Sequence, residues 1–248
     1  MSSQTETQTS PPQGTATPII VATDLSAGYG GVPIVRNLNL RVNKGEIVSL
    51  LGPNGAGKTT TILAIAGELK PLSGTVELNG QIATSPLFKR AKAGLRLITE
   101  ERSVFMTLTV QENLRLSHKD FSSCLELFPE LTPLLGRKAG LLSGGEQQML
   151  TLARALVGGC SCLLADELSL GLAPLASERL LAAVRGAAEA GTAVLLVEQN
   201  LERALKIADR AYVLQRGRVV MEGTAQYISE HKDDVINSYL SPVSMVDE

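Results

Sequence analysis

Short apolar runs separated by turn residues dominate the chain from position 19 to position 80. The runs are rich in β-branched residues, and turn signals at 43–45 and 72–74 break them at intervals expected of strands. One stretch after Thr59 instead repeats its apolar residues at helical spacing. Its stripe consists of Ile62, Leu63, Ile65, Ala66 and Leu69. The pattern therefore predicts a β-rich unit that contains a single helix.

The hydrophobic period becomes helical over about 86–157, apart from a short segment at 95–99. We expect a helical lobe there, inside one domain that spans 19–240. Beyond the lobe, apolar runs at 162–165 and 192–197 flank a helical pattern over 176–190. This strand–helix–strand rhythm indicates a parallel sheet, and residues 215–218, with Gly217, predict a hairpin turn. Residues 241–248 form an expected tail.

The composition is that of a globular protein, with 44% of the 248 residues hydrophobic and 19% charged. The 23 basic and 25 acidic residues leave a formal charge of −2, so bulk charge gives no signal of nucleic-acid binding. Three cysteines, Cys124, Cys160 and Cys162, favour a reducing compartment over a disulfide framework. Because no second ligand pair lies near the C-x-C, ordinary buried thiols are favoured over a metal site.

Residues 1–18 are rich in Ser, Thr, Gln and Pro, and they lack the basic start and apolar core of a secretory signal. We expect a disordered tail there. No run approaches the ~18 consecutive apolar residues of a membrane span. If the protein works at a membrane, other chains are expected to cross it.

A phosphate-binding loop is the strongest motif. A strand pattern at 46–51 leads into G-x-x-x-x-G-K-[ST] and then into the helix after Thr59, which is the context that this motif requires. The motif residues, with the next helical residue, are Gly52, Pro53, Asn54, Gly55, Ala56, Gly57, Lys58, Thr59 and Thr60. The glycines let backbone N–H groups approach phosphate oxygens, Lys58 reaches the β and γ phosphates, and the Thr59 hydroxyl suits Mg²⁺. The sequence therefore predicts binding of a nucleoside triphosphate with Mg²⁺.

Two adjacent carboxylates, Asp166 and Glu167, end the apolar run at 162–165. A buried strand rarely ends in paired acids unless their charge has a partner. Strand neighbours point to opposite sides, so the two acids are expected to have different roles. We assign Asp166 to the metal and Glu167 to the attacking water, against the alternative of a solvated acidic turn.

The segment LSGGEQQ at 142–148 opens a second amphipathic helix. Ser143, followed three residues later by Glu146, is a capping-box pattern at a helix start, which is a favourable place for an anion. The pattern does not explain Gly144 and Gly145, because glycine in a helix costs about 1 kcal/mol relative to alanine. Close approach of the backbone to a ligand does explain them.

With the phosphate loop before it and LLADE after it, LSGGEQQ resembles the signature motif of the ATP-binding cassette (ABC) ATPases. The order and spacing of the motifs match over about 19–223. The resemblance implies an α/β fold: a P-loop NTPase core with an N-terminal antiparallel β subdomain and an inserted α-helical lobe. It also implies a head-to-tail dimer in which Ser143, Gly144 and Gly145 complete the partner's ATP site. Tyr29 matches the aromatic residue that stacks on adenine, with a turn or core tyrosine as the alternative.

Finer likeness is carried by TEERSVFMTLTVQENL, LSGGEQQML, DELSLGLAP and LLVEQN. These segments resemble the second ATPase of branched-chain (hydrophobic) amino-acid importers, although related amide and urea importers share several of them. Several positions depart from the wider family: Glu100 stands where most members have Gln, Gln199 where most have His, and Leu168 where most have Pro. The segment 171–174 also replaces the Asp-containing loop that is more common in the family. Glu100 is still expected to approach Mg²⁺ or water, and Gln199 to bind the γ-phosphate without taking a proton.

The resemblance implies an ATPase that drives import through separate membrane chains. The expected partners are a second copy or a second ABC ATPase, integral membrane permease subunits and, indirectly, a solute-binding protein, with no nucleic acid. The expected location is cytoplasmic, on the inner face of the cell membrane. The alternatives are an amide or urea importer, a soluble ABC protein acting on ribosomes or DNA, and a small-molecule kinase, which would leave LSGGEQQ unexplained.

Overall fold

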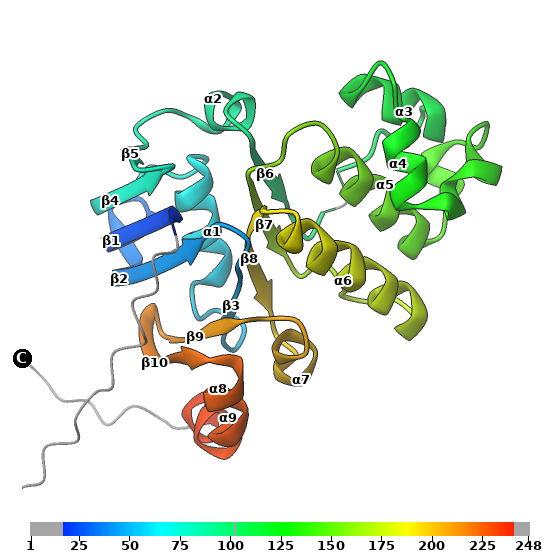
Figure 1. Ribbon diagram of the computed structural model, residues 1–248. Coiled ribbons are helices and arrows are strands. Elements are labelled where there is room, and N and C mark those ends of the chain that lie inside the picture. Colours follow the sequence, from blue (N-terminus) through cyan, green and yellow to red (C-terminus); the bar gives the residue numbers. More distant parts are fainter. Residues whose placement is uncertain (1–16, 102, 241–248) are drawn as a thin grey trace, which may run out of the picture.

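The computed structural model describes residues 17–101 and 103–240, folded around two β-sheets (Figure 1). The expected tails at 1–18 and 241–248 lie outside the described residues, except for Thr17 and Pro18. Pro18 already pairs with Asn43, so the first strand begins at this proline. A strand can begin with proline because its first residue has no need of a ladder N–H group.

The smaller sheet is antiparallel and has the strand order β2-β1-β4-β5. Its strands are β1 (Pro18–Tyr29), β2 (Val32–Asn43), β4 (Ser73–Leu78) and β5 (Gln81–Ile82). It accounts for the β-rich pattern of the first third, and Asn79-Gly80 forms the tight turn that joins β4 to β5, with positive φ at both residues.

The larger sheet has the strand order β10-β9-β3-β8-β7-β6. Its strands are β3 (Ile47–Leu51), β6 (Leu95–Ile98), β7 (Cys162–Asp166), β8 (Ala193–Glu198), β9 (Arg210–Gln215) and β10 (Arg218–Thr224). All neighbours pair in parallel except β9 and β10, which form the predicted hairpin. The parallel sheet predicted from the strand–helix–strand rhythm is thus confirmed.

Successive side chains along each central strand point to opposite faces of the large sheet, so they pack into two separate hydrophobic cores. In β8, Leu195 and Val197 belong to one hydrophobic cluster, whereas Val194 and Leu196 belong to another. The first cluster fills the space between the two sheets around α1 (Lys58–Ala66), and the second lies under α5 (Gly144–Leu156) and α6 (Pro174–Glu189). Both faces are covered, which explains why these strands read as continuous apolar runs.

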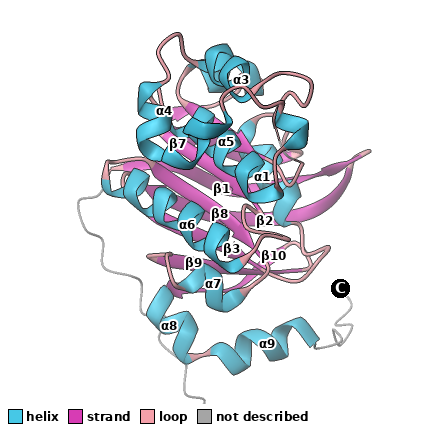
Figure 2. Ribbon diagram, turned by 90° about the vertical axis from the view of Figure 1, so that its right-hand side faces the viewer, coloured by secondary structure: helices cyan, strands magenta, loops and turns pink. Residues whose placement is uncertain are grey.

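Within the expected lobe lie α2 (Leu87–Lys92), α3 (Val110–Ser117), α4 (Ser122–Leu127), the two 3₁₀ segments Pro129–Leu134 and Ala139–Leu141, and α5. The strand β6 falls inside the same range but pairs with β7 in the large sheet. The boundaries of the lobe stay a prediction. At the other end of the large sheet, α7 (Leu201–Leu205), α8 (Ala225–Glu230) and α9 (Lys232–Leu240) pack beside β9 around a third cluster. Figure 2 shows α3, α4 and α5 at one end of the large sheet and α7, α8 and α9 at the other, with α6 between them.

The three cysteines carry free thiols. Cys124 and Cys162 are buried and Cys160 is half-buried. Burial raises the pKa of Cys124 and of Cys160 to about 11, so these thiols stay protonated at neutral pH. In the described part of the chain, no helix is long and apolar enough to cross a bilayer.

Candidate functional site

Most of the predicted site residues lie at one edge of the large sheet. Parallel strands present their carboxyl ends at the same edge, and β3, β8, β7 and β6 are neighbours in that order. The phosphate loop follows β3, Asp166 ends β7, Gln199 follows β8, and Glu100 lies two residues beyond β6. The strand order therefore brings together groups that are up to 147 positions apart, 52 to 199, in the sequence.

The phosphate loop needs its first and last glycines for different reasons. A Cβ atom at Gly52 would lie 2.3 Å from the carbonyl oxygen of Leu214, so only glycine fits against this neighbouring strand. Gly57, the N-cap of α1, has φ of +104°, a conformation that side-chain-bearing residues rarely adopt. Because no side chain caps this helix start, its N–H groups remain available to a phosphate.

Lys58 is folded back over the loop. Its ammonium donates hydrogen bonds to the carbonyl oxygens of Gly52, at 2.8 Å, and Pro53, at 3.1 Å. Burial lowers the pKa of Lys58, while the nearby carboxylates of Glu167, Asp166 and Glu198 oppose that shift. The loop is thus held around a largely buried cation.

Asp166 and Thr59 meet beside the loop. The Thr59 hydroxyl donates to Asp166 Oδ2 at 2.7 Å. The other carboxylate oxygen, Oδ1, is buried and has no hydrogen-bond partner among the described residues. Burial raises the pKa of Asp166, the Thr59 hydrogen bond opposes the shift, and the nearby charges of Glu167 and Glu100 add to it. An orphaned carboxylate oxygen next to a threonine hydroxyl fits the oxygen ligands that Mg²⁺ prefers.

Glu167 does not continue the strand that ends at Asp166. Its φ of +49° turns the backbone into the left-handed region, and its N–H donates to the carbonyl of Val197 at 2.9 Å. The Glu167 side chain is half-buried, and its Oε1 accepts a hydrogen bond from Gln199 Nε2. Glu167 therefore lies directly against the residue that follows β8, while Asp166 faces Thr59, so the two acids have different partners.

The predicted helix start at Ser143 is confirmed, including both halves of the capping box. Ser143 Oγ accepts from Glu146 N, and Glu146 Oε2 accepts from Ser143 N at 2.6 Å. A Cβ atom at Gly145 would lie 2.8 Å from Cβ of Ala176 on α6. Close packing of α5 against α6 therefore explains Gly145 without any ligand, which the sequence pattern did not reveal.

Two parts of the predicted site stay separate from the rest. Tyr29 ends β1 and is 52% exposed. Within residues 17–101 and 103–240, no hydrogen bond or ion pair joins Tyr29, Ser143, Gly144 or Gly145 to the phosphate loop. The sequence expectation places the last three in a partner's site, and this role stays a prediction.

A buried polar group next to Glu167 was missed by the sequence reading. Glu198, the last residue of β8, is 4% exposed, and its Oε1 accepts a hydrogen bond from the fully buried hydroxyl of Ser169. Burial raises the pKa of Glu198, and the Ser169 hydrogen bond and the charge of Arg203 oppose the shift. The sequence does carry a signal for this buried carboxylate, because Glu198 is an acidic residue at the end of an apolar run, directly before Gln199.

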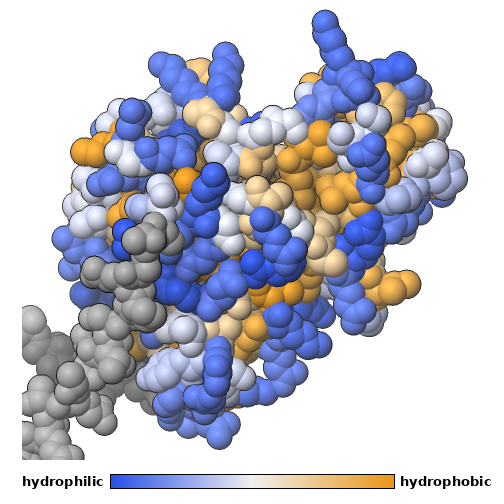
Figure 3. All heavy atoms as spheres, in the orientation of Figure 1, coloured by the Kyte–Doolittle hydropathy of each residue, from blue (hydrophilic) through white to orange (hydrophobic). Residues whose placement is uncertain are grey.

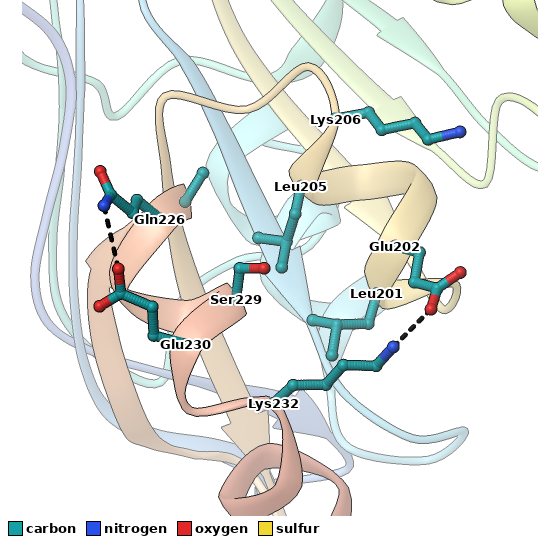
Figure 4. Close-up of a pocket in the computed structure, with 9 residues that line it drawn as sticks. Leu201, Glu202, Leu205, Lys206, Gln226, Ser229, Glu230 and Lys232 are labelled. Atoms are coloured by element: carbon teal, nitrogen blue, oxygen red, sulfur yellow. Dashed lines mark hydrogen bonds and ion pairs between the residues drawn. The ribbon is translucent and has the colours of Figure 1, made fainter.

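A cavity of about 670 Å³ lies between α7 and α8 (Figure 4). Four of its polar side chains pair with one another, because Gln226 donates to Glu230 and Lys232 forms an ion pair with Glu202. None of the predicted site residues lines it. The predicted site residues are thus grouped at the sheet edge and not at this cavity.

Hydrophobic surface gathers where the large sheet meets the helices of the lobe (Figure 3). The segment between β6 and α3 contributes Phe105, which is 54% exposed, and Met106, which is 45% exposed. The segment before α5 adds Leu141, which is 63% exposed, and its neighbour Gly140 donates a backbone hydrogen bond to Met106 O at 2.9 Å. We name Phe105, Met106 and Leu141 the junction surface.

Comparison with known proteins gives consistent results. Residues 35–169 match a family described as ABC transporter. The chain is 40% identical over 210 residues to the high-affinity branched-chain amino acid transport ATP-binding protein BraG of Pseudomonas aeruginosa, covering 81% of this chain and 90% of that protein. It is 33% identical to the lipopolysaccharide export system ATP-binding protein LptB of Escherichia coli, covering 83% and 90%. A solved ATP-binding subunit of an ABC transporter superposes with a TM-score of 0.78 at 27% identity, covering 90% of this chain and 100% of that one.

Proposed function

Because the chain belongs to the ABC transporter family, in which it is an ATP-hydrolysing subunit with the P-loop fold, we propose that it powers an importer of branched-chain or other hydrophobic amino acids. The observation that carries the substrate class is the 40% identity to BraG, whose name states branched-chain amino acid transport. Import and the identity of the solute are parts of the proposal. The cytoplasmic location of the chain, on the inner face of the membrane, is a further part of the same proposal.

We assign ATP to the sheet edge described above. The phosphates lie over the loop from Gly52 to Thr60, Lys58 supplies positive charge, and Tyr29 contacts the adenine. Asp166, Thr59 and Glu100 hold Mg²⁺, which when bound neutralises phosphate charge and polarises the phosphoryl group. The orphaned Oδ1 of Asp166 supports this ligand set.

Glu167 orients and deprotonates the attacking water. A carboxylate that is half-buried and held by one hydrogen bond from Gln199 keeps a second oxygen for this task. Gln199 is neutral and serves as a hydrogen-bond donor, first to Glu167 and then to the γ-phosphate. Base chemistry therefore rests on Glu167 alone.

A second cassette completes the site. In the proposed dimer, each helix start at Ser143–Gly145 faces the phosphate loop of the other subunit. The exposed Ser143, and the absence of hydrogen bonds and ion pairs between these residues and their own loop in the described part of the chain, support this arrangement. The partner is either a second copy or a second ABC ATPase.

The junction surface, Phe105, Met106 and Leu141, is where we place the membrane permease subunits. Isolated exposed hydrophobic residues are common, but three on adjoining segments form a patch that favours an interface. This surface also follows Glu100 in the chain, so a shift at the nucleotide can reach it through the β6–α3 segment. A solute-binding protein then contacts the permease and not this chain.

Uptake measurements test the transport class directly. Cells that lack the chain are expected to lose ATP-dependent uptake of labelled leucine, isoleucine or valine and to recover it when the wild-type gene is restored. Restoration by a Lys58→Ala variant would contradict the assignment of the phosphate loop. If uptake of amides or urea fails instead, the related importer class is correct; if an exported lipid accumulates, the direction is wrong.

Gln199→Ala is expected to lower kcat of the assembled complex by about 10-fold or more, because one transition-state hydrogen-bond donor is lost. The KM for ATP is expected to change much less, since Lys58 and the loop remain. Gln226→Ala provides a matched control, because Gln226 is an exposed residue of α8 whose amide hydrogen-bonds Glu230 on the same helix. A Gln199→Ala enzyme with full ATPase activity would refute the role of Gln199.

A further inference from the structure

The turn after Glu167 is tied to the protein at Ser169. This residue is fully buried, and its hydroxyl donates to Glu198 Oε1 at 2.8 Å. The same hydroxyl accepts from Arg203 Nη1 at 3.0 Å, and that guanidinium also reaches the Ser169 carbonyl at 3.3 Å. A hydroxyl that donates and accepts at once has its rotamer fixed. Ser169 is therefore immobilised by the end of β8 and by α7.

Leu168, the preceding residue, is held by a different element, the helix α5. Its carbonyl oxygen accepts from Gln148 Nε2 at 3.1 Å, and Gln148 is a buried residue of α5. The Leu168 side chain is 1% exposed in the second hydrophobic cluster. Three separate elements, α5, β8 and α7, thus hold two consecutive residues.

These ties matter because Glu167 has an uncommon backbone. Its φ of +49° lies in a region that non-glycine residues seldom occupy, and such a conformation persists only where the surroundings determine it. Glu198 also immediately precedes Gln199, so one buried carboxylate links the Glu167 turn to the residue that hydrogen-bonds Glu167.

We propose that Ser169 and Glu198 are positioning residues of ATP hydrolysis, which hold the Leu168–Ser169 turn so that the Glu167 carboxylate stays against Gln199. The inference rests on the proposed role of Glu167 as the base. Among the described residues, no hydrogen bond joins Ser169 or Glu198 to the phosphate loop. Their effect is therefore on the rate of the chemical step and not on ATP binding.

The test compares steady-state ATP hydrolysis by variants of the intact chain assembled with its permease subunits. Ser169→Ala removes the hydroxyl, and kcat is expected to fall on the order of 10- to 100-fold, the range for small misplacement of a catalytic group. The KM and the equilibrium affinity for ATP are expected to stay within about twofold on the same reasoning, because transition-state geometry alone is lost. Ser177→Ala is the matched control: Ser177 is 3% exposed, and its hydroxyl has no hydrogen-bond partner among the described residues.

A second pair separates positioning from general damage to the fold. Glu198→Gln keeps an oxygen that accepts from Ser169 and is expected to retain most of the wild-type kcat, whereas Glu198→Leu is expected to match Ser169→Ala. Wild-type kcat in both Ser169→Ala and Glu198→Leu would overturn the inference, as would an equal loss of ATP affinity and kcat. If Glu167→Gln itself hydrolyses ATP normally, the proposed function of Glu167 fails instead, so the two failures are distinct.

Discussion

Glu167→Gln is expected to reduce ATP hydrolysis by about 10²- to 10⁴-fold, the usual contribution of a general base, while ATP affinity is retained. The amide keeps the volume and one hydrogen-bond acceptor for Gln199 but cannot take a proton from water. Because bound ATP is no longer consumed, the proposed closed dimer is expected to accumulate. Steady-state phosphate release and small-angle scattering with Mg²⁺ and ATP measure the two effects.

Glu222→Gln is a suitable control for Glu167→Gln, since Glu222 is an exposed residue of β10 at the far edge of the large sheet. It is expected to hydrolyse ATP at the wild-type rate. Normal turnover by Glu167→Gln would remove Glu167 from the base role. A variant that is inactive but monomeric with ATP, even when permease subunits are present, would instead contradict the shared site.

Asp166→Asn is expected to have opposite effects on activity and stability. Loss of a charged metal ligand is expected to lower Mg²⁺-dependent hydrolysis by about 10²-fold or more, the usual effect of removing one well-placed electrostatic group. The metal-free, nucleotide-free variant is nevertheless expected to melt at a higher temperature than wild type at neutral pH. Asp166 is buried with one unpartnered oxygen, so its charge is unfavourable until a cation binds.

The pH dependence of this stability difference has a definite sign. Burial raises the folded-state pKa of Asp166 above its ordinary value of 3.8. The folded protein therefore binds more protons than the unfolded chain between these two pKa values, and wild type loses stability as the pH rises through that window. The advantage of Asp166→Asn is full above the raised pKa and vanishes below about 3.8.

Thermal melts in a chelating buffer from about pH 3.8 to pH 8, with Asp233→Asn at an exposed position of α9 as the control, measure this difference. The gap between Asp166→Asn and wild type is expected to shrink toward the acid end, while the Asp233→Asn melting temperature follows wild type. A gap that is constant with pH, or that widens toward acid, would contradict the assigned cause.

The linear pattern of the chain was enough to predict the phosphate loop, the capping box at Ser143, the parallel strands and the hairpin at Gly217. Each of these depends on neighbours within a few positions, through turn geometry, side-chain period or backbone N–H groups. The expected ABC fold is confirmed by the solved cassette that superposes on the chain.

Other features depend on strand order and on packing between distant segments, which one sequence does not specify. Glu198 was noted only as part of a segment, because its partner Ser169 is 29 positions away. A Cβ atom at Gly145 would lie against Ala176 on the adjoining helix, a packing reason for glycine that no local pattern reveals, and the expected contact of Gly145 with a ligand stays a prediction. The roles of the individual site residues stay predictions, while their grouping at the sheet edge is a result of β8 lying between β3 and β7.

The two loop carbonyls that receive the Lys58 ammonium also bear on how products leave. Under the proposed assignment of ATP to the loop, the Gly52 and Pro53 carbonyl oxygens accept hydrogen bonds from the Lys58 ammonium when the phosphates leave, so the buried cation keeps polar partners. Because these carbonyl oxygens stabilise the ammonium in the empty loop, we expect release of the phosphates to cost less free energy. We therefore expect these two hydrogen bonds within the loop to favour rapid exchange of ADP for ATP.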